Sequence, residues 1–240
     1  MYGWRAKIGL LVPSVNNTLE MDMHRLAPPG IAIHTARMWW SETPDATVNV
    51  LENTVGQIIE PAKNVASAGV DVIAYGCTSG SFFKGAGWDK EVASIIHKST
   101  GVPAVTTATA MLEALKSSGI KNVCVVTPYP DEVNRRLRSF LENNNCEVVE
   151  LFGMDIKDAR KHATVDTGDI YRAAREIFKA PGEGVFIACT QLRALDVIEV
   201  LEQDLGVPVI GAGQALFWLA LKTVKVRGSI HGYGKLLETF

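Results

Sequence analysis

Two cysteines, Cys77 and Cys189, each follow a short hydrophobic run, and each begins the same dipeptide, Cys-Thr. The runs cover residues 70–76 and 184–188, and both have the β-branched and small residues of buried parallel strands. In open α/β sheets, ligands bind beyond the carboxyl ends of the strands. The two thiols therefore predict a pair of nucleophilic or acid/base groups that face one substrate.

Neutral hydrogen-bond donors follow the same strand ends and suit a carboxylate ligand. A loop that opens a helix also offers free N–H groups and a positive dipole, which favour an anion and lower the pKa of a nearby thiol. The alternative is structural: Asn16, Thr78 and Ser79 are also typical helix caps, and Tyr129 is a plausible turn residue. The predicted substrate-binding residues are Pro13, Asn16, Thr78, Ser79, Tyr129 and Thr190.

The remaining cysteines and the histidines give no sign of a metal or cofactor. Cys124 lies within an apolar run and is expected in the core, and Cys146 follows an Asn-rich turn. No Cys-x-x-Cys or His-x-x-x-His pair occurs, so no metal is expected. His97 and His162 stand among charged residues and are expected to face solvent. The chain also lacks the Walker and Gly-x-Gly-x-x-Gly motifs, so no cofactor is expected.

The composition is that of an ordinary globular protein. The chain has 240 residues, of which 47% are hydrophobic and 21% charged, and its formal net charge is −2. Nothing in this balance favours nucleic acid or an anionic membrane as a partner. No apolar run is long enough to span a membrane, and the N-terminus lacks a signal-peptide pattern, so we expect a cytoplasmic protein. The apolar stretch 216–221 suits either the core or the interface of a homo-oligomer.

Strand-like and helix-like segments alternate along the chain, which predicts parallel sheets with helical crossovers. The expected strands cover residues 7–12, 31–36, 70–75, 104–106, 122–127, 147–151, 184–188 and 207–210. The expected helices cover residues 48–68, 90–99, 108–118, 131–143, 167–179, 193–205 and 213–223.

The chain also repeats itself. The spacing from Pro13 to Cys77 nearly equals that from Pro128 to Cys189, and a Gly-Val-Pro phrase and an alanine-rich segment follow each cysteine. This order predicts two pseudo-symmetric α/β lobes, each a parallel sheet flanked by helices, with a cleft between them. The expected lobes are residues 1–115, on which residues 221–240 pack back, and residues 116–220.

Four phrases resemble the aspartate/glutamate racemase superfamily, and most closely its maleate cis-trans isomerase and arylmalonate decarboxylase branch. The Pro-Ser-x-Asn opening, together with both cysteines, resembles maleate isomerase. Residues 81–85 and 129–134 resemble arylmalonate decarboxylase, which has only the second cysteine and a glycine at the first position. The presence of Cys77 favours an isomerase or a racemase. The four phrases are residues 12–16, 76–82, 127–134 and 188–190.

The resemblance to the isomerases implies unequal roles for the thiols. Cys77 would add to the double bond of a cis-enedioate such as maleate, and Cys189 would transfer the proton. Asn16, Thr78, Ser79 and Tyr129 would hold the carboxylates. The family's isomerases also use an asparagine in a loop of the second lobe. Here residues 153–159 contain none, and Asp155 and Asp158 in that stretch would repel a second carboxylate.

Other functions use the same features differently. A two-thiol amino-acid or hydantoin racemase would remove a proton with one cysteine and return it with the other. A decarboxylase would need one protonating cysteine and an apolar pocket, for which Phe82, Phe83, Trp39 and Trp40 are candidates. Outside catalysis, the alternatives are a two-lobed small-molecule binding protein and a redox-sensing dithiol.

Overall fold

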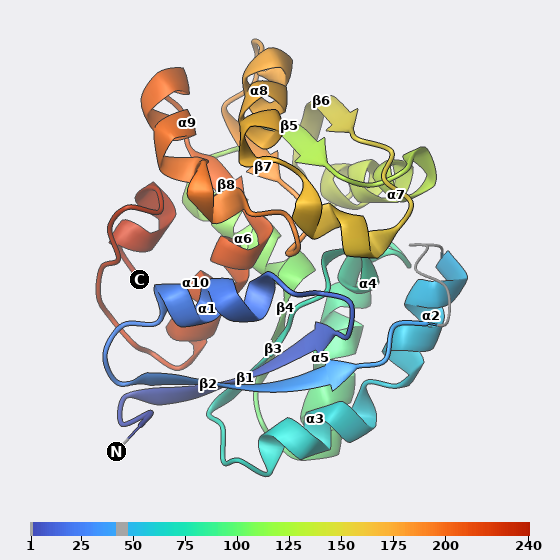
Figure 1. Cartoon of the computed structure of the whole chain (residues 1–240), viewed down its shortest axis with the longest axis vertical. Coiled ribbons are helices and arrows are strands. Elements are labelled where there is room, and N and C mark those ends of the chain that lie inside the picture. The colour runs from blue at the N-terminus through green and yellow to red at the C-terminus, as the bar shows by residue number, and fades with distance from the viewer. Residues whose placement is uncertain (1, 42–47) are drawn as a thin grey trace.

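The computed structural model describes residues 2–41 and 48–240. Within these residues, eight parallel strands form two four-stranded sheets, one in each lobe (Figure 1). The first sheet has the order β2-β1-β3-β4 and the second β6-β5-β7-β8, so the repeat seen in the sequence is a repeat of topology. The strands are β1 (Ala6–Pro13), β2 (Ile31–Met38), β3 (Val72–Tyr75), β4 (Ala104–Thr106), β5 (Asn122–Thr127), β6 (Glu147–Gly153), β7 (Gly184–Ile187) and β8 (Val209–Gly211).

Helices connect the strands and cover the sheets. The predicted α/β class with two pseudo-symmetric lobes is confirmed, and each of the eight expected strands is present. The helices are α1 (Leu19–Leu26), α2 (Val48–Gly56), α3 (Ile59–Ala66), α4 (Thr78–Phe82), α5 (Trp88–Thr100), α6 (Thr107–Ser117), α7 (Asp131–Glu142), α8 (Thr167–Ile177), α9 (Ile198–Leu205) and α10 (Ala212–Thr223), with 3₁₀ turns η1 (Ala159–Thr164), η2 (Ala194–Asp196) and η3 (Lys235–Glu238).

Two expected helices are broken. The single helix expected over residues 48–68 is α2 followed by α3. Pro61 explains the break, because it cannot donate to the carbonyl of Gln57 and its ring would clash with that group in a continuous helix. The helix expected over residues 193–205 is η2 followed by α9.

Three helical segments near the strand ends have no counterpart among the expected helix ranges: α1, α4 and η1. Of these, α1 has a readable signal, because Leu19, Met23 and Leu26 are buried at helical spacing. α4 and η1 are one to two turns long, too short for a periodic pattern.

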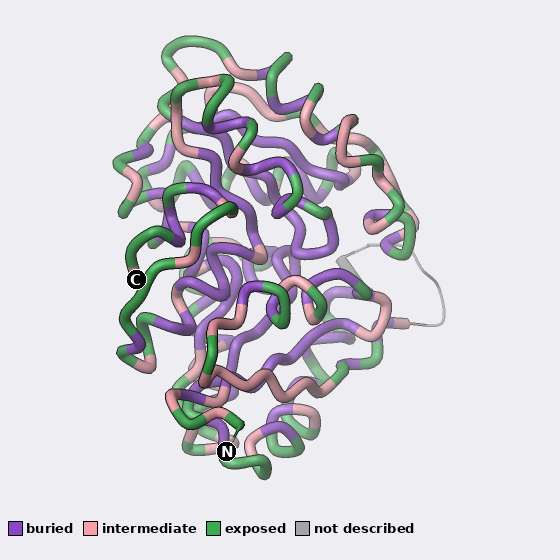
Figure 2. Tube along the Cα trace, turned by 60° about the vertical axis from the view of Figure 1, so that its left-hand side comes forward, coloured by how far each residue is buried: buried purple, intermediate pink, exposed green. Residues whose placement is uncertain are grey.

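The hydrophobic core continues from one lobe into the other (Figure 2). One cluster contains side chains of β1 and β3 in the first lobe together with most of the second lobe's core. α6 and α10, the alanine-rich helices at equivalent places in the repeat, pack against each other between the sheets. A second cluster lies on the other face of the first sheet, under α3 and α5. The lobes are therefore joined by packed side chains and not by a linker alone.

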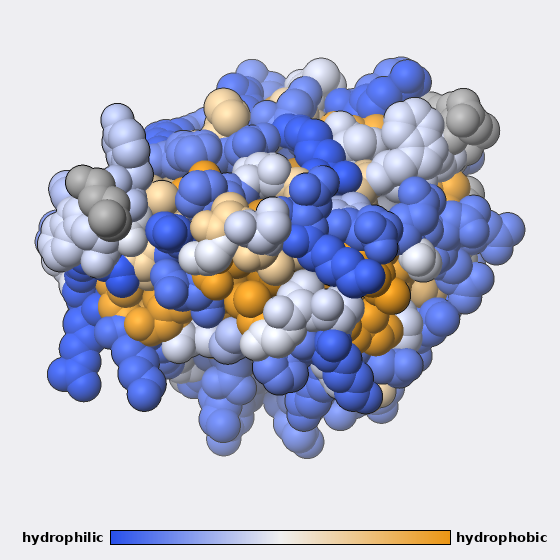
Figure 3. All heavy atoms as spheres, turned by 90° about the horizontal axis from the view of Figure 1, so that it is seen from below, coloured by the Kyte–Doolittle hydropathy of each residue, from blue (hydrophilic) through white to orange (hydrophobic). Residues whose placement is uncertain are grey.

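The C-terminal segment after α10 touches both lobes. The Arg5 Nη2 atom donates to the carbonyl of Arg227 at 2.8 Å, and the backbone N–H of Lys235 donates to Glu202 Oε2 at 2.8 Å. Hydrophilic side chains cover most of the face seen in Figure 3, with apolar side chains in separate patches between them. No helix in the described part of the chain is both long and apolar enough to cross a membrane.

Candidate active site

A narrow cavity of about 30 Å³ lies between the lobes at the carboxyl ends of the strands. All of the predicted catalytic and substrate-binding residues line it, from the end of β1 and the start of α4 in the first lobe and from the β5–α7 and β7–η2 connections of the second. Trp40, which follows β2, and two residues of η1 contribute the remaining wall. The described lining residues are Pro13, Val15, Asn16, Trp40, Cys77, Thr78, Ser79, Tyr129, Ala159, His162, Cys189, Thr190 and Gln191.

Cys77 lies one residue after Gly76, which follows β3, and it directly precedes the first turn of α4. Its side chain is only 5% exposed, and this burial raises the pKa of the thiol to about 11. Hydrogen bonds from the Gly80 N–H and the Ser79 hydroxyl act in the opposite direction but are outweighed. The expectation of a lowered thiol pKa at this helix start is therefore wrong, because loss of hydration destabilises the thiolate more than the local hydrogen-bond donors stabilise it.

Gly80 leaves the space that the Cys77 sulfur occupies. A Cβ atom at this position would lie 2.5 Å from the Tyr75 hydroxyl oxygen and 2.9 Å from Cys77 Sγ. Both contacts are shorter than packed atoms allow. The glycine in the Thr-Ser-Gly-Ser phrase is therefore a steric requirement of the thiol site.

Cys189 has a backbone conformation that its counterpart lacks. Its φ is +85°, in the left-handed region that favours glycine, whereas Cys77 is extended with φ of −128°. Burial raises the pKa of the Cys189 thiol, opposed by hydrogen bonds from the Gln191 N–H and the Tyr129 hydroxyl. The two strand-end cysteines thus share a place in the repeat but differ in local geometry.

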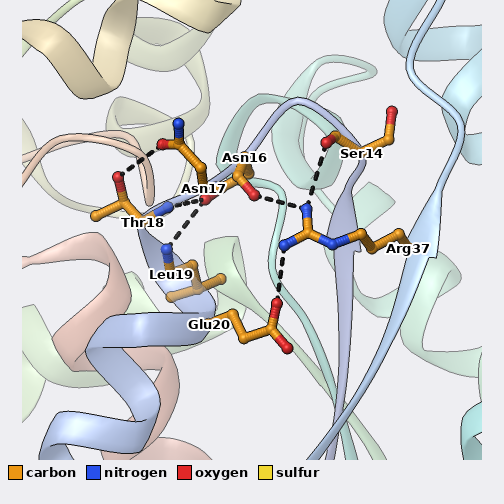
Figure 4. A network of polar contacts seen from close by, with 7 residues as sticks. All are labelled: Ser14, Asn16, Asn17, Thr18, Leu19, Glu20 and Arg37. Atoms are coloured by element: carbon orange, nitrogen blue, oxygen red, sulfur yellow. Dashed lines mark hydrogen bonds and ion pairs between the residues drawn. The ribbon is translucent and has the colours of Figure 1, made fainter.

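Asn16 ties the lobes together and caps α1 at the same time. Its Oδ1 atom accepts hydrogen bonds from the N–H groups of Thr18 and Leu19, each at 3.0 Å (Figure 4). Its Nδ2 atom donates to Thr190 Oγ1 in the other lobe at 3.1 Å. The capping interpretation of Asn16 is therefore correct, and the same amide also faces the cavity. Arg37 fixes the loop from behind by donating to the carbonyl of Asn16 at 2.8 Å.

Thr190 and Thr78 complete this contact between the lobes. The Thr190 hydroxyl donates to the carbonyl of Gly76 at 3.1 Å, and its N–H donates to Thr78 Oγ1 at 3.3 Å. The hydroxyl groups of Thr78 and Thr190 are therefore held in position by hydrogen bonds between the segments that follow β3 and β7.

Tyr129 presents its phenol to the cavity from the β5–α7 connection. Asn134 holds this loop by donating from Nδ2 to the Tyr129 carbonyl at 2.8 Å, and Thr127 accepts from the Tyr129 N–H at 3.1 Å. Burial raises the pKa of the phenol well above its usual range, and the nearby cysteines add to this effect. Tyr129 is therefore a neutral hydroxyl donor at physiological pH.

His162 was missed: it was expected to face solvent, but it is only 3% exposed and lines the cavity. A 3₁₀ turn has three residues per turn, so His162 and Ala159 share one face of η1, and that face is the cavity wall. The charged residues next to His162, on which the prediction was based, do not line the cavity. Asp158 accepts from the Arg160 N–H at 2.9 Å and pairs with the Arg160 guanidinium.

Two further sequence interpretations change. Asp155 and Asp158 do not line the described cavity, so the predicted repulsion of a second carboxylate does not arise from direct contact. Of the four aromatic residues suggested for an apolar pocket, Trp40 is among the described lining residues, whereas Phe82, Phe83 and Trp39 are not.

In the described part of the chain, no group of three or more His, Cys, Asp or Glu side chains is placed to hold a metal ion.

Comparison with known proteins confirms the resemblance read from the sequence. The family model described as arylmalonate decarboxylase matches residues 8–237. An arylmalonate decarboxylase from Bordetella bronchiseptica is 30% identical over 234 residues, which cover 96% of each chain. A maleate isomerase from Nocardia farcinica is 25% identical over 243 residues, which cover 97% of this chain and 95% of the relative. The crystal structure of a cysteine-to-alanine mutant of the maleate isomerase Iso from Pseudomonas putida S16 with maleate has a TM-score of 0.92 and 25% identity, and covers 97% of each chain. With nearly its whole length matched, the chain belongs to the arylmalonate decarboxylase family.

Proposed function

We propose that this protein is a cofactor-independent isomerase of a small carboxylic acid, acting on a cis-enedioate such as maleate. The observation that carries the proposal is that the two strand-end thiols, one from each lobe, line a single cavity among neutral hydrogen-bond donors. We take the lobes as residues 1–115 and 116–220, with residues 221–240 assigned to the first. Relatives named maleate isomerase, matched along nearly the whole chain, support the substrate class.

The reaction needs one thiolate and one thiol. The Cys77 thiolate forms a bond to one alkene carbon, and the π electrons move to the neighbouring carbon and its carboxylate as an enediolate. Cys189 gives its proton to that carbon. The central bond is then single and rotates. Cys189 takes the proton back, the carbon–sulfur bond breaks towards Cys77, and the double bond re-forms as the trans isomer.

Neutral donors hold the carboxylates in this scheme. The cavity lining supplies the side chains of Asn16, Thr78, Ser79 and Thr190, next to Pro13 at the end of β1. The Tyr129 phenol stays protonated because burial raises its pKa, so it donates to the enediolate rather than repelling it. Donors fixed by hydrogen bonds between the lobes need little reorganisation as charge develops.

Alanine variants of the two thiols test the proposal. Cys77→Ala and Cys189→Ala should each lower the rate of maleate-to-fumarate conversion by about 10²–10⁴-fold. The conversion is followed by proton NMR. Cys146→Ala is the matched control, because Cys146 is buried but lies outside the cavity lining. Wild-type activity in either of the first two variants would refute the mechanism.

Decarboxylation of an arylmalonate is the second candidate, and the family model and the 30% identical relative favour it. It would use Cys189 alone to protonate the carbanion left by CO₂. Replacing Cys77 separates the two functions, because Cys77→Gly abolishes isomerisation but leaves a decarboxylase active. Assays of phenylmalonate and maleate on the wild type and this variant therefore decide between them.

A further inference from the structure

The buried His162 has one nitrogen committed to the backbone and the other directed at Cys189. Nε2 lies 3.0 Å from the carbonyl oxygen of Ile156, and Nδ1 lies 3.7 Å from Cys189 Sγ. A carbonyl can only accept, so Nε2 carries the hydrogen. In the neutral imidazole Nδ1 then has a free lone pair and accepts from the Cys189 S–H. The backbone therefore selects the tautomer that can take a proton from this thiol.

The cavity contains little else that could balance a negative charge. None of its described lining residues is lysine or arginine. Among them, His162 is the only side chain that can become a cation near neutral pH. A dicarboxylate brings two negative charges into this space, and a cation beside Cys189 would offset part of them.

The protonation of the two thiols also points to His162. Burial raises the pKa of both thiols, so each sulfur carries a hydrogen at rest. The addition step of the proposed reaction uses one thiolate and one thiol, so one proton must be held elsewhere. The groups that face His162 are Cys189 and Tyr129, with Asp158 adding a favourable charge from its own turn. Tyr129 is protonated already, which leaves the imidazole as the acceptor.

We propose that His162 and Cys189 form a proton-transfer pair, in which the imidazole takes up the thiol proton when an anionic substrate binds. The S–H bond of Cys189 breaks, its electron pair stays on sulfur, and an N–H bond forms at Nδ1. The Cys77 proton then passes to the Cys189 thiolate, which leaves Cys77 as the nucleophile and Cys189 as the acid. This pair deepens the proposed function, on which its role in turnover rests.

The neutral state is the resting state of the pair. Burial lowers the pKa of His162, although the bond to Ile156 and the charge of Asp158 oppose this effect. A small population of the thiolate–imidazolium form exists beside it, because the negative sulfur, 3.7 Å from Nδ1, stabilises the imidazolium and keeps the shared proton on the pair. While the pair holds this single proton, the share of the thiolate form does not change with pH. A lone buried thiol behaves differently, because its thiolate fraction rises about tenfold per pH unit below its pKa.

This difference gives a test that needs no substrate. The wild-type protein is treated with iodoacetamide between pH 6.5 and 8, and the alkylation rate of each cysteine is measured by mass spectrometry of peptides. We expect the rate at Cys189 to change less than about threefold over this range, while the rate at Cys146 rises about tenfold per pH unit. Both members of the pair belong to the second lobe, so separation of the lobes to admit the reagent leaves their contact intact.

Variants of His162 sharpen the result. Asparagine places an amide at the Nδ1 position, which can bond to the thiol but cannot take a proton, and glutamine keeps only the donor to Ile156. His162→Asn and His162→Gln should each restore the tenfold slope at Cys189 and lower kcat on maleate at least tenfold. His97→Asn, at an exposed histidine bonded to the Val102 carbonyl, should change neither. A tenfold slope at Cys189 in the wild type overturns the proposal even if both variants fail to fold. If the wild type does not convert maleate, the proposed substrate is wrong, but the slopes still decide whether the pair exists.

Discussion

The left-handed backbone at Cys189 predicts an unusual response to substitution by glycine. Its φ of +85° costs an ordinary residue about 1–2 kcal/mol, a cost that glycine does not carry. Against this, glycine loses about 0.5–1 kcal/mol more backbone entropy than alanine, and removing a buried methyl group costs about 0.8 kcal/mol. At an unstrained buried position the change from alanine to glycine should therefore destabilise by about 1.5 kcal/mol, whereas at position 189 it should be close to neutral.

Cys124 supplies the matched unstrained position. It is a buried cysteine within β5, and its φ is not positive. The measurement is the free energy of unfolding in urea, followed by tryptophan fluorescence, for the alanine and glycine variants at both positions. The penalty for glycine relative to alanine should be about 1–2 kcal/mol smaller at 189 than at 124. Equal penalties at the two positions would show that the backbone at Cys189 is not strained, and the argument would fail.

Two further predictions concern the thiol pocket and the contact between α1 and η2. Gly80→Ala should lower kcat at least tenfold and destabilise the fold by about 1–3 kcal/mol, because the new Cβ atom displaces Cys77 Sγ. Gly56→Ala is the control and should do neither, because no atom lies within 4 Å of its new Cβ atom. Asp22 has its pKa raised to about 7, chiefly by burial and also by Asp196. Because this folded-state pKa exceeds the unfolded one, stability is lost as pH rises towards 7, so Asp22→Asn should stabilise by about 1–3 kcal/mol at pH 8 and by less at pH 5 in urea unfolding. A gain from Asp22→Asn that is independent of pH would contradict the assignment.

The strand ends and the site residues that follow them could be predicted from the sequence, because local residue patterns determine them. Short apolar runs fix the strands, parallel strands place their carboxyl ends at one edge, and the repeat brings the second edge opposite the first. These steps alone locate Cys77, Cys189 and the donors around them. The two-cysteine pattern needed no knowledge of side-chain packing.

The burial of His162 and the direction of the thiol pKa shifts could not be predicted, because both depend on contacts between distant parts of the chain. Whether His162 is buried depends on how η1 packs under Tyr129, a contact between residues far apart in the chain. Its neighbours Arg160 and Lys161 are charged, so the local pattern indicated a solvent-facing turn. The sign of the pKa shift at Cys77 likewise depends on a balance between burial and donors, and sequence shows only the donors.

α6 and α10 hold equivalent places in the two halves of the repeat and bury their apolar faces against each other. If the two halves were identical separate chains, each would expose this face to water, and pairing about a two-fold axis would cover it. Both strand-end cysteines of that symmetric dimer would have had identical surroundings, so neither could have been specialised as nucleophile or acid. With both halves in one chain the two sites can differ, and the positive φ and the imidazole at Cys189 alone make the surroundings of the two thiols unequal.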